Sequence, residues 1–140
     1  MKKIILVLLI IAASFTAVYA GEENVTPKVL NAFNTEFTTA QEVKWTKSNE
    51  YFKAAFSLNG QRIFAFYSLE GDFLAISRNL STAQLPLHLM RGIQEKITNG
   101  YWVRDLFEMS TPEGTSYYIT LEDADSKTVL KSSGGDNWNV

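Results

Sequence analysis

The chain has 140 residues, of which 46% are hydrophobic, and this is enough for one compact domain with a buried core. Its formal net charge is −2 and its basic residues are scattered singly, which argues against nucleic acid as a partner. The sequence contains no cysteine, so disulfides and a lipid anchor attached to cysteine are excluded.

The first 20 residues are typical of a secretory signal peptide. A basic start precedes an apolar run from residue 4 to 13, and small residues lead up to an expected cleavage site after Ala20. The alternative is a transmembrane anchor, but the run is shorter than the ~20 residues that span a bilayer. We therefore expect an exported protein, periplasmic or secreted, with no membrane span after signal cleavage. Removing Lys2 and Lys3 with the signal leaves 120 residues with 11 basic and 15 acidic side chains, a net charge of −4.

A helix is expected to begin at Thr26-Pro27. Threonine is a favourable N-cap, and proline is tolerated at the first helical position because its missing N–H costs nothing there. Val29, Phe33 and Phe37 then recur every four residues, which predicts one apolar stripe along about three turns. From residue 40 the pattern alternates between apolar and polar residues, which predicts a strand with one buried face.

The stretch from Tyr51 to Ile76 is expected to form a meander of three strands. Its apolar and aromatic runs are interrupted only at Asn59-Gly60 and at residues 70–72. Asn-Gly favours the positive φ angles of a two-residue type I′ hairpin. The first half of the chain is therefore predicted to be a helix followed by four antiparallel strands.

The second half repeats this order. Leu85-Pro86 opens a helix with a stripe of Leu89, Ile93 and Ile97, and Asn99-Gly100 is expected to cap its C-terminus. Three strands are predicted over residues 101–109, 116–121 and 128–131, and residues 132–140 are expected to form a flexible tail.

The mature chain, residues 21–140, is therefore predicted to be a single α+β domain made of two tandem helix-plus-antiparallel-meander repeats. The repeats cover about residues 25–79 and 80–133, and an offset of 54 aligns Ile63 with Tyr117. The helices are expected to pack on one face of a curved antiparallel sheet.

The overlay also predicts which side chains face the helices. These are Tyr117, Ile119 and Leu121 and, by correspondence, Ile63, Ala65 and Tyr67. The intervening aromatic residues would then lie on the far face, and exposed aromatic patches often bind partners. Two alternatives are a register error of one residue and a curved sheet that covers the rings with its own edges. The candidate binding residues are Phe64, Phe66 and Tyr118, with Tyr51 and Trp102 as neighbours.

No catalytic residue, metal ligand or cofactor site is predicted. His88 is the only histidine and no G-x-S-x-G motif exists, so a surface position is favoured over a general base. The acidic cluster around Asp123 and Asp125 is similar to the start of a calcium loop, but Lys127 occupies a ligand position, which favours a polar hairpin turn. No single pair of carboxylates suggests a glycosidase.

The order of motifs resembles the PepSY-like family of exported bacterial proteins, whose fold is compared with that of the β-lactamase inhibitor protein. The resemblance covers most of the mature chain. The residues that carry it are Ala40-x-x-Val43-x-Trp45, Tyr51, Phe56, Asn59-Gly60, Ala65-x-Tyr67, Gly71, Arg78 and Leu85-Pro86.

This resemblance implies helices on one face of the sheet, a free concave face and a non-enzymatic role, since PepSY-type domains are thought to bind or restrain secreted peptidases. The β-lactamase inhibitor grips its target with aromatic residues of its concave face. The present chain lacks that protein's disulfides and shows no inhibitory loop. We therefore expect an exported module that binds a secreted or envelope enzyme, with a small-molecule or glycan binder of the periplasm as the alternative. The edge strands also leave a homodimer open.

Overall fold

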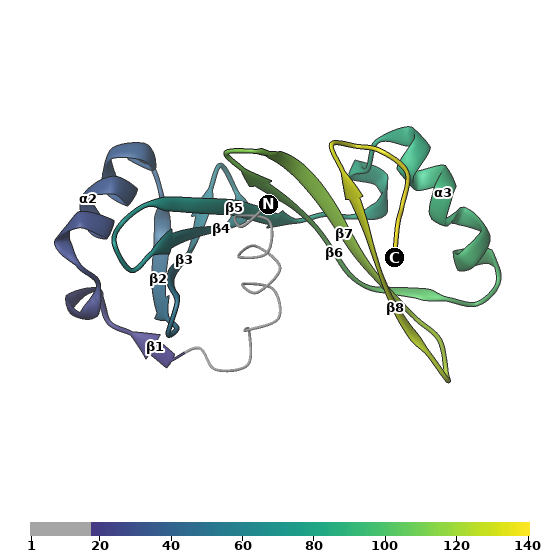
Figure 1. Ribbon diagram of the computed structural model, residues 1–140, viewed down its shortest axis with the longest axis horizontal. Coiled ribbons are helices and arrows are strands. Elements are labelled where there is room, and N and C mark those ends of the chain that lie inside the picture. The colour runs from purple at the N-terminus through teal and green to yellow at the C-terminus, as the bar shows by residue number, and fades with distance from the viewer. Residues whose placement is uncertain (1–17) are drawn as a thin grey trace. The chain divides into compact units, whose positions relative to one another are not determined.

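The computed structural model describes residues 18–140 (Figure 1), so most of the expected signal peptide lies outside the described residues. The chain divides into two compact units, of which the first ends at Ile76 and the second begins at Ser77. This boundary lies inside strand β5 (Phe73–Asn79), three residues before the predicted end of the first repeat.

The first unit consists of a short 3-10 helix, one α-helix and antiparallel strands in the sheet order β1-β2-β3-β4-β5. Helix α2 begins at Pro27 with Thr26 as its N-cap, as predicted from the sequence. Strand β1 was not expected, because it falls at the end of the predicted signal peptide. The elements are β1 (Val18–Ala20), η1 (Glu22–Asn24), α2 (Pro27–Glu36), β2 (Gln41–Lys47), β3 (Tyr51–Leu58) and β4 (Gln61–Ser68), followed by β5.

The hairpin between β3 and β4 has the predicted tight turn. Asn59 and Gly60 have φ angles of 51° and 79°, the left-handed values that a type I′ turn requires. This turn fixes the register, in which Ala54 pairs with Ala65 and Phe56 pairs with Ile63. The turn thereby decides which side chains of both strands share a face.

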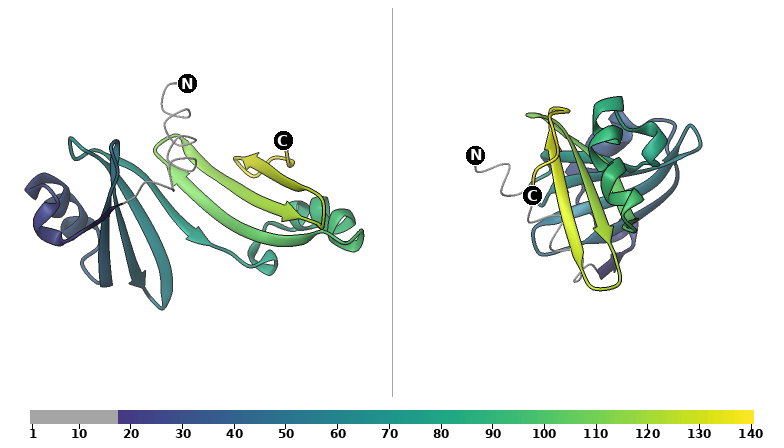
Figure 2. Two further views of the ribbon diagram at one scale, coloured as in Figure 1. Left: turned by 90° about the horizontal axis from the view of Figure 1, so that it is seen from below. Right: turned by 90° about the vertical axis from the view of Figure 1, so that its right-hand side faces the viewer.

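Helix α2 covers one face of these strands (Figure 2). Val29 and Phe33 from its apolar stripe are buried against the strands, and Phe33 makes edge contacts with Trp45 and Phe56 at ring-centroid distances of 5.2 and 5.1 Å. The prediction that one set of β4 side chains faces the helix is confirmed. This set consists of Ile63, Ala65 and Tyr67, all of which belong to the buried core of the first unit.

The second unit has the sheet order β5-β6-β7-β8 and one α-helix on its core side (Figure 1). Leu89 and Ile93 of α3 pack against Ile119 and Leu121, as the apolar stripe predicted. The helix ends at the predicted position, where Gly100 has a φ angle of 97°. The elements are η2 (Thr82–Gln84), α3 (Leu87–Thr98), β6 (Trp102–Thr111), β7 (Gly114–Glu122) and β8 (Lys127–Ser133). The fold class is α+β with antiparallel strands.

The C-terminal segment is held in place in the structure, whereas the sequence predicted a flexible tail. Asn139 exchanges backbone hydrogen bonds of 2.8 and 2.7 Å with Lys131. The indole of Trp138 lies against α3 and donates a hydrogen bond of 2.8 Å from Nε1 to the carbonyl oxygen of Leu89. The tail is therefore anchored by an aromatic side chain that is half-buried on the core of the second unit.

The order of a 3-10 helix, an α-helix and antiparallel strands occurs in each unit. With the predicted offset of 54, strands β4 and β5 correspond to β7 and β8. Strand β2 has no counterpart, because residues 95–101 lie in the last turns of α3 and in the loop after it. Tandem duplication of the unit stays a prediction.

Candidate binding surface

The side chains of β3 and β4 that point away from α2 form what we call the far face of the first unit. The register places Lys53 opposite Phe66 and Ala55 opposite Phe64 on this face, and Tyr51 lies at its end, opposite Ser68. The structure therefore brings together three of the five candidate residues, as the alternation in the sequence predicted.

The expected exposure of Phe66 is wrong, and its expected neighbour Tyr51 is buried as well. Tyr51 and Phe66 are only 3% and 7% exposed, because their rings pack edge to face with centroids 5.6 Å apart. Phe64 is half-buried, and the ammonium of Lys53 lies 5.5 Å from the centre of its ring. Alternation predicts the face on which a ring lies, but it does not predict how completely neighbouring side chains cover that ring.

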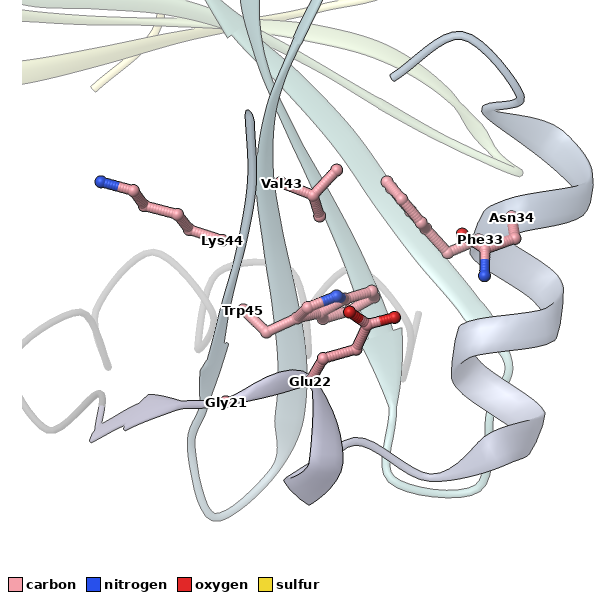
Figure 3. Close-up of a pocket in the computed structure, with 7 residues that line it drawn as sticks. All are labelled: Gly21, Glu22, Phe33, Asn34, Val43, Lys44 and Trp45. Atoms are coloured by element: carbon pink, nitrogen blue, oxygen red, sulfur yellow. The ribbon is translucent and has the colours of Figure 1, made fainter. Parts of the chain in front are cut away.

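Three basic residues and the carboxylate of Glu42, which accepts a hydrogen bond from Ser57, lie on the far face of the first unit, so basic groups outnumber acidic groups there although the chain as a whole is acidic. Lys44 and Arg62 are exposed on it, and Figure 3 shows Lys44 pointing away from α2. Burial lowers the pKa of Lys53, since desolvation disfavours its charged form. Among the described residues, no carboxylate lies within ion-pair distance of the Lys53 ammonium. An acidic group from outside the chain would offset this desolvation.

The other two candidate residues lie on the corresponding face of the second unit. Tyr118 is only 4% exposed. Its ring stacks on the ring of Phe107, with the centroids 5.1 Å apart, and the ammonium nitrogen of Lys131 lies 5.5 Å from its centroid. Its expected exposure is therefore also wrong. Trp102 on β6 is 51% exposed, and so is Val129 on β8, which pairs with the other side of β7. Trp102 pairs with Glu122, which lies four residues beyond Tyr118 along β7. The rings of Trp102 and Tyr118 therefore do not form one cluster.

A pocket that the sequence reasoning missed opens between β2 and α2 in the first unit (Figure 3). Its volume is about 320 Å³, and the side chains of Phe33, Val43 and Trp45 supply its apolar wall. Gly21 and Glu22, where the mature chain is expected to begin, lie at its rim. The sequence contained one signal for this pocket. Val43 and Trp45 alternate along the predicted strand, and Phe33 belongs to the apolar stripe of the helix before it.

The polar residues that were considered as candidates for catalysis or metal binding take part in local contacts that stabilise the fold. His88 is exposed, and its Nε2 contacts the carbonyl oxygen of Gly135. Asp123 Oδ1 accepts hydrogen bonds of 2.8 and 2.7 Å from the backbone N–H groups of Asp125 and Ser126, which lowers the pKa of this carboxyl group. The acidic cluster thus forms a polar hairpin turn. No group of His, Cys, Asp and Glu that could hold a metal ion occurs within residues 18–140.

The part of the chain that the structure describes contains no helix that is long and apolar enough to cross a membrane.

Solved structures share this fold. A BLIP-like protein from Bacteroides fragilis NCTC 9343 superposes with a TM-score of 0.71 at 20% identity, covering 82% of this chain and 83% of its own. A DUF2874 family protein from Bacteroides uniformis ATCC 8492 and a predicted periplasmic protein from Bacteroides eggerthii DSM 20697 each reach a TM-score of 0.73 at 14% identity, covering 81% of this chain and 85% of theirs. No family model matches the chain, and no curated protein matches it.

These similarities establish a BLIP-like fold. At identities of 20% and below they carry the fold alone, so membership of the PepSY-like family remains a prediction from the sequence motifs.

Proposed function

We propose that this protein is an exported, non-enzymatic binding module that inhibits or regulates a peptidase or another enzyme of the cell envelope. The amino-terminal signal pattern supports export, and so does the structural similarity to a predicted periplasmic protein. The BLIP-like fold and the PepSY-like motifs support a role in binding proteins.

The observation that carries this proposal is the composition of the two sheet faces that point away from the helices. The first unit presents half-buried Phe64 beside Lys53, and the second presents exposed Trp102. Aromatic side chains are suited to anchor a protein interface, because they bury large areas with few rotatable bonds. The three other candidate rings on these faces are buried, so they contribute to the packing of the faces and not to an exposed contact surface. They belong to Tyr51, Phe66 and Tyr118.

The partner surface is proposed to be acidic around an apolar centre. Lys44, Lys53 and Arg62 give the first unit a positive face, and a partner carboxylate would offset the desolvation of Lys53.

The experiment is capture of a partner from the native cell envelope with the exported chain. Trp102→Ala and Phe64→Ala are the test variants. Leu87→Ala is the matched control, because Leu87 is a large apolar side chain that is 71% exposed on α3, on neither of these faces. One protein that is retained by the parent and by Leu87→Ala, but lost by either test variant, supports the proposal. Equal capture by all four proteins, or no specific capture, contradicts it.

The alternative is a small-molecule or glycan binder. The pocket of about 320 Å³ favours it, since ligand pockets begin at roughly this size and are lined by aromatic side chains. A thermal-shift screen of sugars and lipids tests it. A rise in melting temperature that disappears in Val43→Asp supports this reading, and a flat screen counts against it.

A further inference from the structure

Strand β2 becomes an open sheet edge if the signal peptide is removed. In the structure, residues 18–20 of β1 pair antiparallel with β2, in the register Val18 to Lys47, Tyr19 to Thr46 and Ala20 to Trp45. Strand β1 is the outermost strand of the sheet. Cleavage after Ala20, which is part of the export proposed above, takes away all three residues. The backbone groups of residues 45–47 that face β1 then lose their partners.

The mature chain is expected to keep its fold after this loss. Among the residues whose burial the structure describes, both cores consist of residues from Val25 onward, and α2 and strands β2 to β4 supply the core of the first unit. The vacated edge is therefore a folded strand with unpaired hydrogen-bonding groups, which is a template for an added strand.

We infer that this edge binds the extended C-terminal segment of a partner protein, which replaces β1 as the outer strand and ends where Gly21 begins. The chain itself shows that the edge accepts an antiparallel strand, since β1 occupies it in the observed register. The further argument concerns which peptide fits, and it follows from the side chains beside the edge.

The pocket specifies one apolar side chain. Side chains of paired residues point to the same face of a sheet, so a peptide residue opposite Trp45 lies on the side of Phe33 and Val43. Figure 3 shows Trp45, Val43 and Phe33 around this space, which has a volume of about 320 Å³. A large aliphatic or aromatic residue at this position would fill the pocket.

The charges along β2 specify acidic neighbours. Lys47 and Lys44 are both exposed. The peptide residue opposite Lys47 comes two positions before the apolar residue, whereas the position opposite Lys44 belongs to Gly21 of the chain itself. Cleavage also leaves an α-ammonium group on Gly21 at the rim of the pocket. The peptide is therefore acidic, variable and apolar in that order, and a C-terminal carboxylate on the apolar residue would face the ammonium group of Gly21.

The same lysines disfavour a second copy of this chain as the occupant. If two β2 strands pair antiparallel over residues 44–47, each Lys44 lies opposite Lys47 of the other strand. Like charges directly opposite one another destabilise a sheet, and edge lysines are a common protection against self-association.

The test starts with the intact mass of the exported protein, which reports whether its first residue is Gly21. The probe is a synthetic peptide of residues 13–20 with Val18→Glu and Ala20→Leu and a free C-terminal carboxylate. We expect the mature chain to bind it, with slower amide hydrogen exchange at Trp45 and Lys47, whose N–H groups face the vacated edge. N-methylation of the peptide backbone at its positions 18–20, or a chain that begins at Val18, should weaken binding at least tenfold. The first change removes the donors, and the second restores the competing strand.

A charge swap provides the matched control. Lys47→Glu should weaken binding of this peptide and strengthen binding of a peptide with lysine in place of its glutamate. A mature chain that begins at Gly21 but does not bind, or that binds the N-methylated peptide equally well, overturns the peptide site and leaves the export proposal intact. A dimer in which residues 45–47 are protected assigns the edge to a second copy. A mature chain that retains residues 18–20 overturns both the cleavage site and the open edge.

Discussion

Replacing Gly92 by alanine tests whether the C-terminal segment is anchored on α3. Glycine in an exposed helix costs about 1 kcal/mol relative to alanine, so this change alone should raise the free energy of unfolding by about that amount. A Cβ atom at Gly92 would lie 3.0 Å from Cδ1 of Trp138, closer than an ordinary van der Waals contact. The indole must then move, which weakens its 2.8 Å hydrogen bond to Leu89, worth about 0.5 to 1.5 kcal/mol. The helix gain is therefore cancelled or reversed.

The assay is a double-mutant cycle in chemical denaturation with the parent, Gly92→Ala, Trp138→Ala and the double variant. We expect Gly92→Ala to add about 1 kcal/mol of stability when Trp138 is absent and nothing when it is present, a coupling of about 1 kcal/mol. If Gly92→Ala stabilises both backgrounds equally by about 1 kcal/mol, the indole does not rest on α3 in solution.

Three further predictions concern the first unit. Tyr67→Phe should leave the free energy of unfolding unchanged or raise it by about 1 kcal/mol, because the buried hydroxyl of Tyr67 has no hydrogen-bond partner among the described residues. Thermal or urea unfolding measures this change. A loss of stability above about 1 kcal/mol would show that the hydroxyl is paired. Burial raises the pKa of Tyr67 from 10.0 to about 12, with a smaller contribution from the negative charge of Glu36, so the folded state holds this proton more tightly. The resulting stability is complete below pH 10 and is lost as the pH rises from 10 through 12, and the parent should lose about 3 kcal/mol more than Tyr67→Phe over this range; equal losses in both proteins contradict this assignment. Gly60→Ala should cost about 1 kcal/mol, because Gly60 has a φ angle of 79° and no atom crowds its Cβ position, whereas Gly60→Asn should cost less in the same unfolding assay.

Local patterns were sufficient to predict the two α-helices and strands β2 to β8, but not β1 or the two 3-10 helices. Pro27 marks the start of α2, Asn59-Gly60 marks the hairpin and Gly100 marks the end of α3, because each of these residues satisfies a backbone requirement that few others satisfy. Once the hairpin turn is fixed, alternation determines the face of every residue in β4. This rule explains why Ile63, Ala65 and Tyr67 all face α2.

Long-range contacts were beyond such patterns. The burial of Phe66 and Tyr118 depends on rings and lysine stems from neighbouring strands, which alternation does not specify. The anchoring of the tail joins Trp138 to Leu89, 49 residues apart in sequence. The pocket depends on how α2 lies beside β2, so its lining residues could be named only as core candidates.

The affinity of a captured partner for purified variants tests the central claim most directly. The dissociation constant is measured for the parent, Phe64→Ala, Trp102→Ala and Leu87→Ala, with melting temperatures to show that each protein is folded. A protein-binding face predicts that Phe64→Ala or Trp102→Ala weakens binding by about 30-fold, the effect of losing about 2 kcal/mol at an interface hot spot, while Leu87→Ala binds like the parent. Unchanged affinity in both aromatic variants, with the fold intact, would show that these sheet faces do not bind the partner.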